Sequence, residues 1–104
     1  MHMTKISASD VLSKKTEGWL SEVVGTVNSN RVNARVMVDV EAQFHVHEDS
    51  DEFFLVINGE IEIDVEEKTI LLGTGETYTV DAGLKHRARA KGRAELITVI
   101  SENA

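Results

Sequence analysis

The stretch that decides the fold is residues 44–60, FHVHEDSDEFFLVINGE. It places two of the chain's four histidines one residue apart, ahead of an acidic cluster and an apolar run. If residues 44–47 are extended, successive side chains alternate between faces, so His45 and His47 point to the same side. In that case two imidazoles converge, and the stretch raises the question of a metal site.

The same two-residue alternation continues along the chain and predicts an all-β protein. Alternating or β-branched runs occur at residues 34–40 (ARVMVDV), 53–57 (FFLVI), 60–65 (EIEIDV), 86–90 (HRARA) and 94–100 (AELITVI). Turn signals separate the runs at Asn28-Ser29-Asn30, Asn58-Gly59, Gly73-Thr74-Gly75, Ala82-Gly83 and Lys91-Gly92. Many short antiparallel strands at such spacing predict a sandwich or a barrel.

Length and composition narrow the function classes. A chain of 104 residues is expected to form a single domain, residues 1–104. It contains no Cys, so any metal must be held by nitrogen and oxygen ligands. A net charge of −7 with few aromatic residues argues against nucleic acid and anionic membranes as partners. We expect a soluble, cytoplasmic protein, because no secretory signal and no long apolar segment is visible.

The N-terminal region predicts a short helical or irregular segment. Ser9 or Asp10 could cap a helix that runs through about Lys15. Trp19 and Leu20 would then cover one end of the sheet. His2 lies so near the start that no role is expected for it.

The metal hypothesis needs ligands beyond the first two histidines. Candidates for a third ligand are Glu48, Asp49, Asp51 and Glu52, and periodicity alone does not choose among them. Glu52 begins the next apolar strand, where its side chain can point inward. His86 opens another strand, on a face with Ala88 and Ala90 that leaves space beside it. An isolated His-x-His is more often structural and an acidic run is more often a solvated turn, so the joint spacing carries the hypothesis.

These residues resemble the first motif of the cupin family. That motif is roughly His-x-His, three or four residues, Glu, six residues and Gly. Here His45 and His47 are followed by four residues, Glu52, six residues and Gly59. A glycine often found six residues before the first histidine is replaced by Asp39.

The second cupin motif is also similar. It reads roughly Gly, five residues, Pro-x-Gly, two residues, His, three residues and Asn. Gly75, Gly83 and His86 fit it, whereas Asp81 replaces the proline and Ala90 the asparagine. None of the replaced positions is a metal ligand in the family.

The resemblance covers about residues 27–100 and is strongest to small single-domain cupins, some of them labelled mannose-6-phosphate-isomerase-like. It implies a double-stranded β-helix, the jelly-roll barrel. It also implies that His45, His47, Glu52 and His86 hold one divalent ion. Three imidazoles and one carboxylate suit iron, manganese, nickel, copper or zinc, and the sequence does not choose among them.

The predicted strand faces place a substrate pocket beside the ligands. We expect Val65 to face inward with the pocket residues, because Glu60, Glu62 and Asp64 need water. Arg35 is the candidate for holding an anionic substrate, although an arginine on a strand is more often solvated or paired. Arg87 and Arg89 are expected to face outward. The pocket candidates are Arg35, Phe54, Val56, Ile61, Ile63, Tyr78 and Ala88.

The opposite faces predict an interface. Phe53, Leu55 and Ile57 would point outward and, with Phe44 and Val46, form more apolar surface than a small monomer usually exposes. Small cupins pair through such a face, so we expect a homodimer. The alternative is that the N-terminal segment covers this face within one chain.

Two function classes remain open. In the first, the protein is a metal-dependent enzyme acting on a small organic metabolite, with dioxygenase-type chemistry if the ion is iron and isomerase- or decarboxylase-type chemistry if it is not. No separate general base is evident. In the second, the barrel is a non-catalytic module that binds or senses a small molecule, with a structural metal or none.

Overall fold

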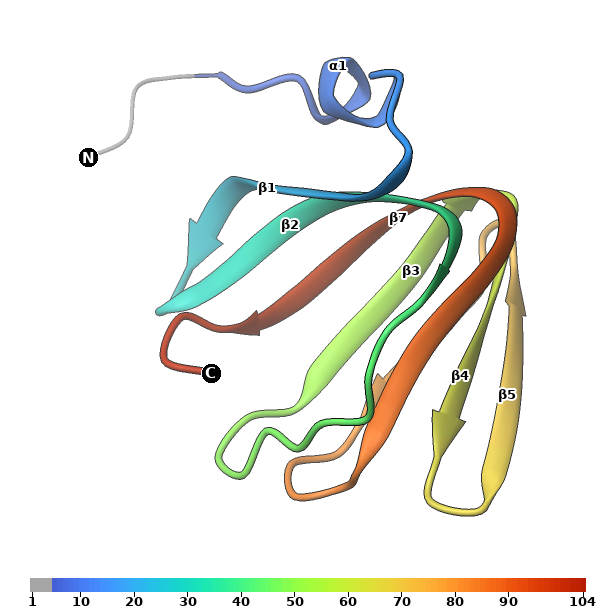
Figure 1. Ribbon diagram of the computed structural model, residues 1–104. Helices are drawn as coiled ribbons and strands as arrows, with labels where there is room; N and C mark the ends of the chain where they lie inside the picture. The colour runs from blue at the N-terminus through green and yellow to red at the C-terminus, as the bar shows by residue number, and fades with distance from the viewer. Residues whose placement is uncertain (1–4) are drawn as a thin grey trace.

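Seven antiparallel strands and one short helix make up the computed structural model, which describes residues 5–104 (Figure 1). The elements are α1 (Ala8–Leu12), β1 (Gly18–Val27), β2 (Asn30–Glu41), β3 (Glu52–Asn58), β4 (Glu60–Val65), β5 (Lys68–Gly73), β6 (Thr77–Val80) and β7 (His86–Ser101). The strands form one sheet in the order β1-β2-β7-β3-β6, and β4 joins β7 to β5. The predicted all-β fold is confirmed. Within residues 5–104, no helix has the length and apolar character needed to cross a membrane.

The long strand β7 makes the sheet curl. Its first half pairs with β4, its second half pairs with β3, and β2 follows it on the other side. The change of partner occurs near Gly92, which has a φ of +72° and donates its N–H to Asp39 Oδ1 at 2.6 Å. The predicted turn at Lys91-Gly92, separating two strands, is therefore wrong. It is a bend inside one strand, because the Asp39 side chain takes up the N–H that the ladder leaves free.

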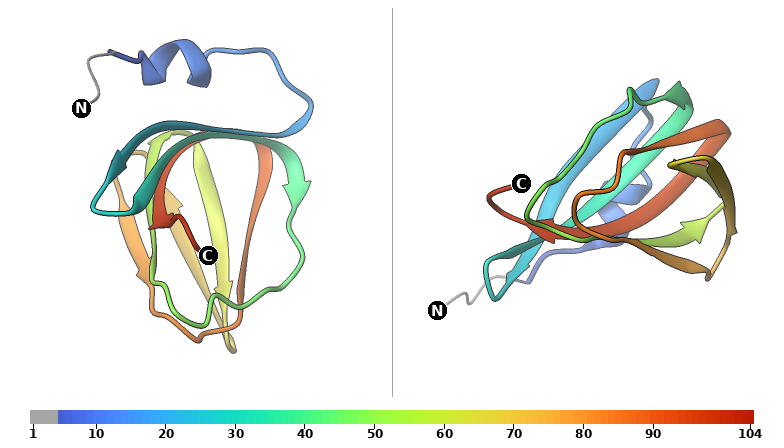
Figure 2. Two further views of the ribbon diagram at one scale, coloured as in Figure 1. Left: turned by 90° about the vertical axis from the view of Figure 1, so that its left-hand side faces the viewer. Right: turned by 90° about the horizontal axis from the view of Figure 1, so that it is seen from below.

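The curled sheet encloses the main core (Figure 2). Alternate residues of the strands point into it, as the two-residue pattern predicted. Its buried members are Met37, Phe54, Val56, Ile61, Ile63, Val65, Leu72, Val80, Ala88, Ala90, Ala94 and Leu96. One end of the same interior is polar, and there Glu52 and His86 are buried beside this apolar core.

The short helix starts and ends earlier than its sequence signals suggested. Its N-cap is Ser7, which accepts a hydrogen bond from the backbone N–H of Asp10, rather than Ser9 or Asp10 itself. It ends at Leu12, not near Lys15. Ser7 is the cap because it stands three residues before Asp10, the spacing at which a hydroxyl can accept a backbone N–H of the first turn that has no partner within the helix.

The N-terminal region also supplies a strand that the sequence did not predict. Trp19 and Leu20 lie within β1 and pair with β2, so they extend the sheet instead of covering its end. Val11 and Leu12 of α1 pack on Ala34 and the neighbouring outer face of β2. The helix thus covers the outer face of the sheet at β1 and β2 (Figure 1). The homodimer stays a prediction.

Asp64 corrects a second expectation. It was expected to need water, but it is buried. Arg89 donates to it from Nε at 2.8 Å and from Nη2 at 3.1 Å, Thr69 Oγ1 donates at 2.7 Å and Arg87 Nε at 2.8 Å. The hydrogen bonds from Arg89 hold the pKa of Asp64 well below its ordinary value, and those from Thr69 and Arg87 add to this, although burial opposes it.

We expect Asp64→Asn to lower the free energy of unfolding by about 1–3 kcal/mol, because it replaces charge-assisted hydrogen bonds with weaker ones. The folded pKa lies below the unfolded value of about 3.9. The contribution of Asp64 is therefore complete at pH 7 and is lost only as the pH falls below about 4. Urea unfolding from pH 7 down to pH 3 measures it. Glu67→Gln, which makes the same charge change in the exposed turn after β4, is the control. An Asp64→Asn variant as stable as this control would contradict the assignment.

Candidate metal centre

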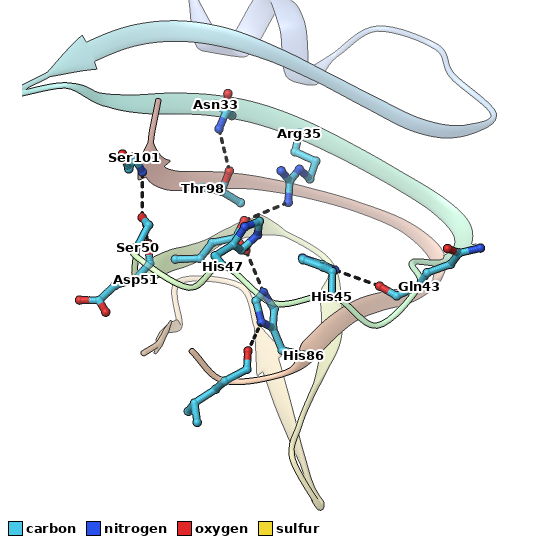
Figure 3. Close-up of polar contacts among 12 residues, drawn as sticks. Asn33, Arg35, Gln43, His45, His47, Ser50, Asp51, His86, Thr98 and Ser101 are labelled. Atoms are coloured by element: carbon cyan, nitrogen blue, oxygen red, sulfur yellow. Dashed lines mark hydrogen bonds and ion pairs between the residues drawn. The ribbon is translucent and has the colours of Figure 1, made fainter. Parts of the chain in front are cut away.

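Four side chains from three parts of the chain meet at the polar end of the barrel (Figure 3). His45 and His47 lie in the connection after β2, Glu52 begins β3 and His86 begins β7. His45 and His86 form an isolated antiparallel bridge, in which each backbone N–H donates to the other's carbonyl at 2.9 Å. This pair of hydrogen bonds holds two histidines that are 41 positions apart in sequence beside each other.

The donor atoms of the four residues are close enough to share one ion. One donor atom from each of His45, His47, Glu52 and His86 lies within 4.8 Å of the others. His86 Nε2 is 3.0 Å from Glu52 Oε1, and His47 Nε2 is 3.5 Å from the same oxygen. Glu52 and His86 are buried, His47 is half-buried and His45 is exposed, so the cluster is open on one side. A cluster of three histidines and one glutamate is compatible with a metal ion.

The surrounding backbone fixes how two of the imidazoles are protonated. His45 Nδ1 lies 2.9 Å from the carbonyl of Gln43, and His86 Nδ1 lies 2.9 Å from the carbonyl of Leu84. A carbonyl oxygen only accepts, so Nδ1 carries the proton in both rings. In each ring, Nε2 is then the atom that gives a metal ion its lone pair once it carries no proton.

The pKa values of Glu52, His86 and His47 are set by burial and by the charged groups around them. Burial alone would raise the pKa of Glu52, but the hydrogen bond from His86 and the charges of Arg35 and the histidines lower it on balance. Burial would lower the pKa of His86, yet its hydrogen bonds to Glu52 and to the Leu84 carbonyl raise it. Burial lowers the pKa of His47, against the attraction of Glu52. The carboxylate is thus kept ionised at neutral pH.

A cation fits between these groups on chemical grounds. With Nδ1 of His86 protonated, its Nε2 lone pair faces a carboxylate oxygen of Glu52 at 3.0 Å. Two acceptors at that distance repel each other unless a proton or a metal ion lies between them. The residues present therefore fit a divalent metal, which would replace that proton.

The loop after the histidines selects Glu52 from the four acidic candidates. Asp51 is occupied elsewhere, since its Oδ1 accepts the backbone N–H of Ala82 at 2.9 Å. Glu48 and Asp49 are exposed and lie outside the cluster. The N–H of Gly83 donates to the carbonyl of His47 at 2.9 Å, so the turn before β7 also fastens this loop.

A cavity of about 170 Å³ adjoins the cluster. It is lined by Trp19, Arg31, Arg35, Ala42, His45, His47, Glu52, Phe54, His86, Ala88 and Ile100. Of the predicted pocket residues, Arg35, Phe54 and Ala88 thus line this cavity. Trp19 and Arg31 were missed, although Arg31 shares the two-residue period of Arg35 and could have been found from it.

The other predicted pocket residues lie away from this cavity. Val56, Ile61 and Ile63 are buried within the main core, and Tyr78 packs against that core from β6. Their inward direction agrees with the sequence pattern, but the core fills the space around them. A contact between these four residues and a substrate stays a prediction.

Comparison with known proteins identifies the family. The family model described as a cupin domain matches residues 34–100, which is more than half of the chain. The chain belongs to the cupin family. It is 33% identical over 98 residues to the uncharacterized protein YdbB of Bacillus subtilis, covering 93% of this chain and 82% of YdbB.

Solved structures superpose on most of the chain. A cupin-2 domain protein from Shewanella frigidimarina has a TM-score of 0.81 at 26% identity, covering 90% of this chain and 91% of its own. TT1209 from Thermus thermophilus has a TM-score of 0.80 at 24% identity, covering 94% and 97%. The jelly-roll cupin fold implied by the two motifs is therefore confirmed.

The structure explains two of the motif positions of this cupin. Gly59, with a φ of +92°, leaves no room for a side chain, because a Cβ would lie 2.6 Å from the carbonyl oxygen of Arg93. Asp39, where the family often has glycine, adopts a φ of +47° at an irregularity in the β2–β7 pairing. Its side chain compensates by accepting the N–H of Gly92.

We expect nuclear magnetic resonance of the zinc-loaded protein to show the Nδ1-protonated tautomer for His45 and His86. Long-range correlations between ring protons and nitrogens distinguish the two tautomers directly. The reason is the pair of Gln43 and Leu84 carbonyls, which only a protonated Nδ1 can satisfy. Protonation at Nε2 in either zinc-loaded ring would rule out the proposed ligand atoms.

Proposed function

We propose that this cupin binds one divalent transition metal ion, namely iron, manganese, nickel, copper or zinc. With that ion bound, the protein is an enzyme that acts on a small organic metabolite. The observation that carries the proposal is the cluster of His45, His47, Glu52 and His86 at the mouth of a cavity of about 170 Å³. That volume is below the usual range of drug-sized pockets, which favours a small substrate.

Each part of the cavity has a separate task in this proposal. When bound, the ion supplies Lewis acidity, or redox chemistry if it is iron, manganese or copper. Phe54 and Ala88 line the same cavity with apolar surface and keep water from the reacting atoms. The exposed side of the cluster, at His45, is the route by which a substrate enters. Membership of the cupin family does not identify the reaction, because proteins of one fold catalyse many different reactions.

The lining favours some reactions over others. Among the described residues that line the cavity, Glu52 is the one acidic side chain and all three histidines belong to the cluster. A separate general base is thus missing from that lining. This favours oxygenase- or decarboxylase-type chemistry over a reaction that shuttles protons. Isomerase-type chemistry also remains in the proposal, provided that one of the metal-binding residues moves the substrate proton.

The same observation favours a second candidate function. A cavity without a free acid or base is suited to holding a ligand unchanged. In that case the protein is a binding or sensing module, and the ion anchors the ligand or stabilises the barrel.

We expect protein prepared without an affinity tag to hold close to one transition metal ion per chain, measured by elemental mass spectrometry. Glu52→Gln and His47→Ala should each lose most of it, because the site cannot keep its affinity after losing one of four ligands. Glu48→Gln is the matched control, since it makes the same change in an exposed acid of the same loop. It should retain the metal.

Two outcomes would contradict the metal site. One is that wild-type protein stays empty after incubation with iron, manganese, nickel, copper and zinc salts. The other is that Glu52→Gln keeps as much metal as Glu48→Gln while both remain folded by circular dichroism.

Turnover separates the enzyme from the binding module. We expect the metal-loaded protein to consume one component of a defined mixture of small organic acids and sugars, followed by mass spectrometry, and Glu52→Gln to do so at least about 100-fold more slowly because its metal is lost. Parallel reactions with and without oxygen identify oxygenase chemistry. Tight binding of a component that is never consumed, with or without oxygen, would favour the module.

A further inference from the structure

Arg35 occupies an unusual position for a cationic side chain. It lies on the inward face of β2 and lines the cavity beside the metal ligands. Figure 3 shows it extending from the strand toward the histidine cluster. Its side chain is only 13% exposed. A buried guanidinium is costly unless its hydrogen bonds and its charge are satisfied.

The fold satisfies Arg35 incompletely. Its Nη1 lies 3.8 Å from Glu52 Oε2, which is an ion pair but too long for a hydrogen bond. Its Nε–H is buried and has no hydrogen-bond partner within the described part of the chain. Burial lowers the pKa of Arg35, against the attraction of Glu52. For comparison, Arg87 and Arg89 on the outer face both donate hydrogen bonds to Asp64.

Metal binding would leave Arg35 with even less compensation. Among residues 5–104, Glu52 is the one carboxylate paired with Arg35, and it is also a member of the metal cluster. A divalent ion at that cluster would be partly neutralised by the same carboxylate, which would then compensate the charge of Arg35 less. The cavity would then hold three cationic groups, the ion, Arg35 and Arg31, facing one carboxylate among the described residues that line it.

The surroundings of Arg35 hold its guanidinium in place. The ring of Trp19 lies 4.5 Å from its Cζ, which is a cation–π contact that fixes the guanidinium plane. Arg31 lines the same cavity, and one of its terminal nitrogens donates to the carbonyl of Glu102 at 3.1 Å. The cavity therefore carries positive charge from β2 opposite the cluster.

We propose that Arg35, oriented by Trp19, is a subsite for the carboxylate of a short organic acid whose neighbouring oxygen lies toward the metal cluster. The inference deepens the proposed function and rests on it. A guanidinium fork pairs with a planar carboxylate through two parallel hydrogen bonds. Apolar contacts to Phe54, Ala88 and Ile100 leave room for only a small carbon skeleton.

A carboxylate is favoured over a phosphate. The planar guanidinium of Arg35 matches a planar carboxylate, and the negative charge of Glu52, 3.8 Å from Arg35, repels a dianion more strongly than a monoanion. Phosphate shares the affinity of carboxylate for arginine, and inorganic phosphate is therefore included in the test.

The test compares binding of lactate, lactamide and inorganic phosphate by calorimetry, on zinc-loaded and on metal-free wild-type protein. Lactate and lactamide have the same shape and differ in charge. We expect lactate to bind at least about 10-fold more tightly than lactamide, as for a charge-assisted hydrogen bond. Trp19 is the sole tryptophan, so a change in its emission on lactate binding would locate the ligand beside Arg35.

The variants separate the subsite from the metal site. Arg35→Gln should retain zinc and reduce the ratio of lactate affinity to lactamide affinity to about one. Arg35→Lys should give a ratio between those of wild type and Arg35→Gln, because it keeps the charge but loses the planar fork. Lys68→Gln, with the same charge change at an exposed position of β5, should behave like wild type.

Several results would overturn the subsite. They are equal binding of lactate and lactamide by wild-type protein, tighter binding of phosphate than of lactate, or an Arg35→Gln variant that keeps its preference for lactate, with or without zinc. If the variant keeps this preference but loses zinc, Arg35 is a positioning residue for Glu52. If wild-type protein takes up no zinc, the proposed function fails. The comparison on metal-free protein then still decides the subsite by the same preference for lactate.

Discussion

The structure of the candidate site depends on the backbone pairing of His45 with His86. Each residue donates to and accepts from the other at 2.9 Å, outside any regular strand ladder. This pairing joins the loop after β2 to the start of β7. Glu52 reaches the same place because β3 pairs with the far half of β7, with Glu52 opposite Ile100. Without that closure, the four donor atoms would belong to separate parts of the chain.

Charged side chains on the two faces of the barrel differ in how completely they are hydrogen-bonded. On the outside, Asp64 receives hydrogen bonds from two arginines and from Thr69, so its charge is fully compensated. On the inside, Arg35 faces Glu52 at 3.8 Å and keeps an unpaired Nε–H. A satisfied network stabilises a fold, whereas unsatisfied buried groups are typical of functional sites. The contrast supports the proposal that a ligand binds at the polar end of its interior.

The errors of the sequence interpretation share a physical cause. The dipeptide Lys91-Gly92 has the composition of a turn, but whether the chain reverses there depends on what pairs with it. Here Asp39, distant in sequence, accepts the Gly92 N–H and lets β7 continue as one strand. In the same way Asp64 looked solvated because an alternating strand carries no information about the arginines on the next strand. Trp19 was read as a cover for the sheet because its partner, Met37, lies across a turn in β2.

The sequence by itself determined the class of fold, the direction in which most strand residues point and the identity of three histidine ligand candidates. These follow from a two-residue period, from glycine positions and from motif spacing, all of which are local. Periodicity left Glu48, Asp49, Asp51 and Glu52 open, and the motif resemblance implied Glu52. Only the tertiary structure showed that Glu52 joins the histidines and the other three acids do not, because this depends on the hydrogen bond that Asp51 accepts from Ala82 and on the pairing of β3 with β7. Only it showed that Trp19 stacks on Arg35 at the cavity. Local pattern fixes which way a side chain points, but contacts between distant strands fix what it meets.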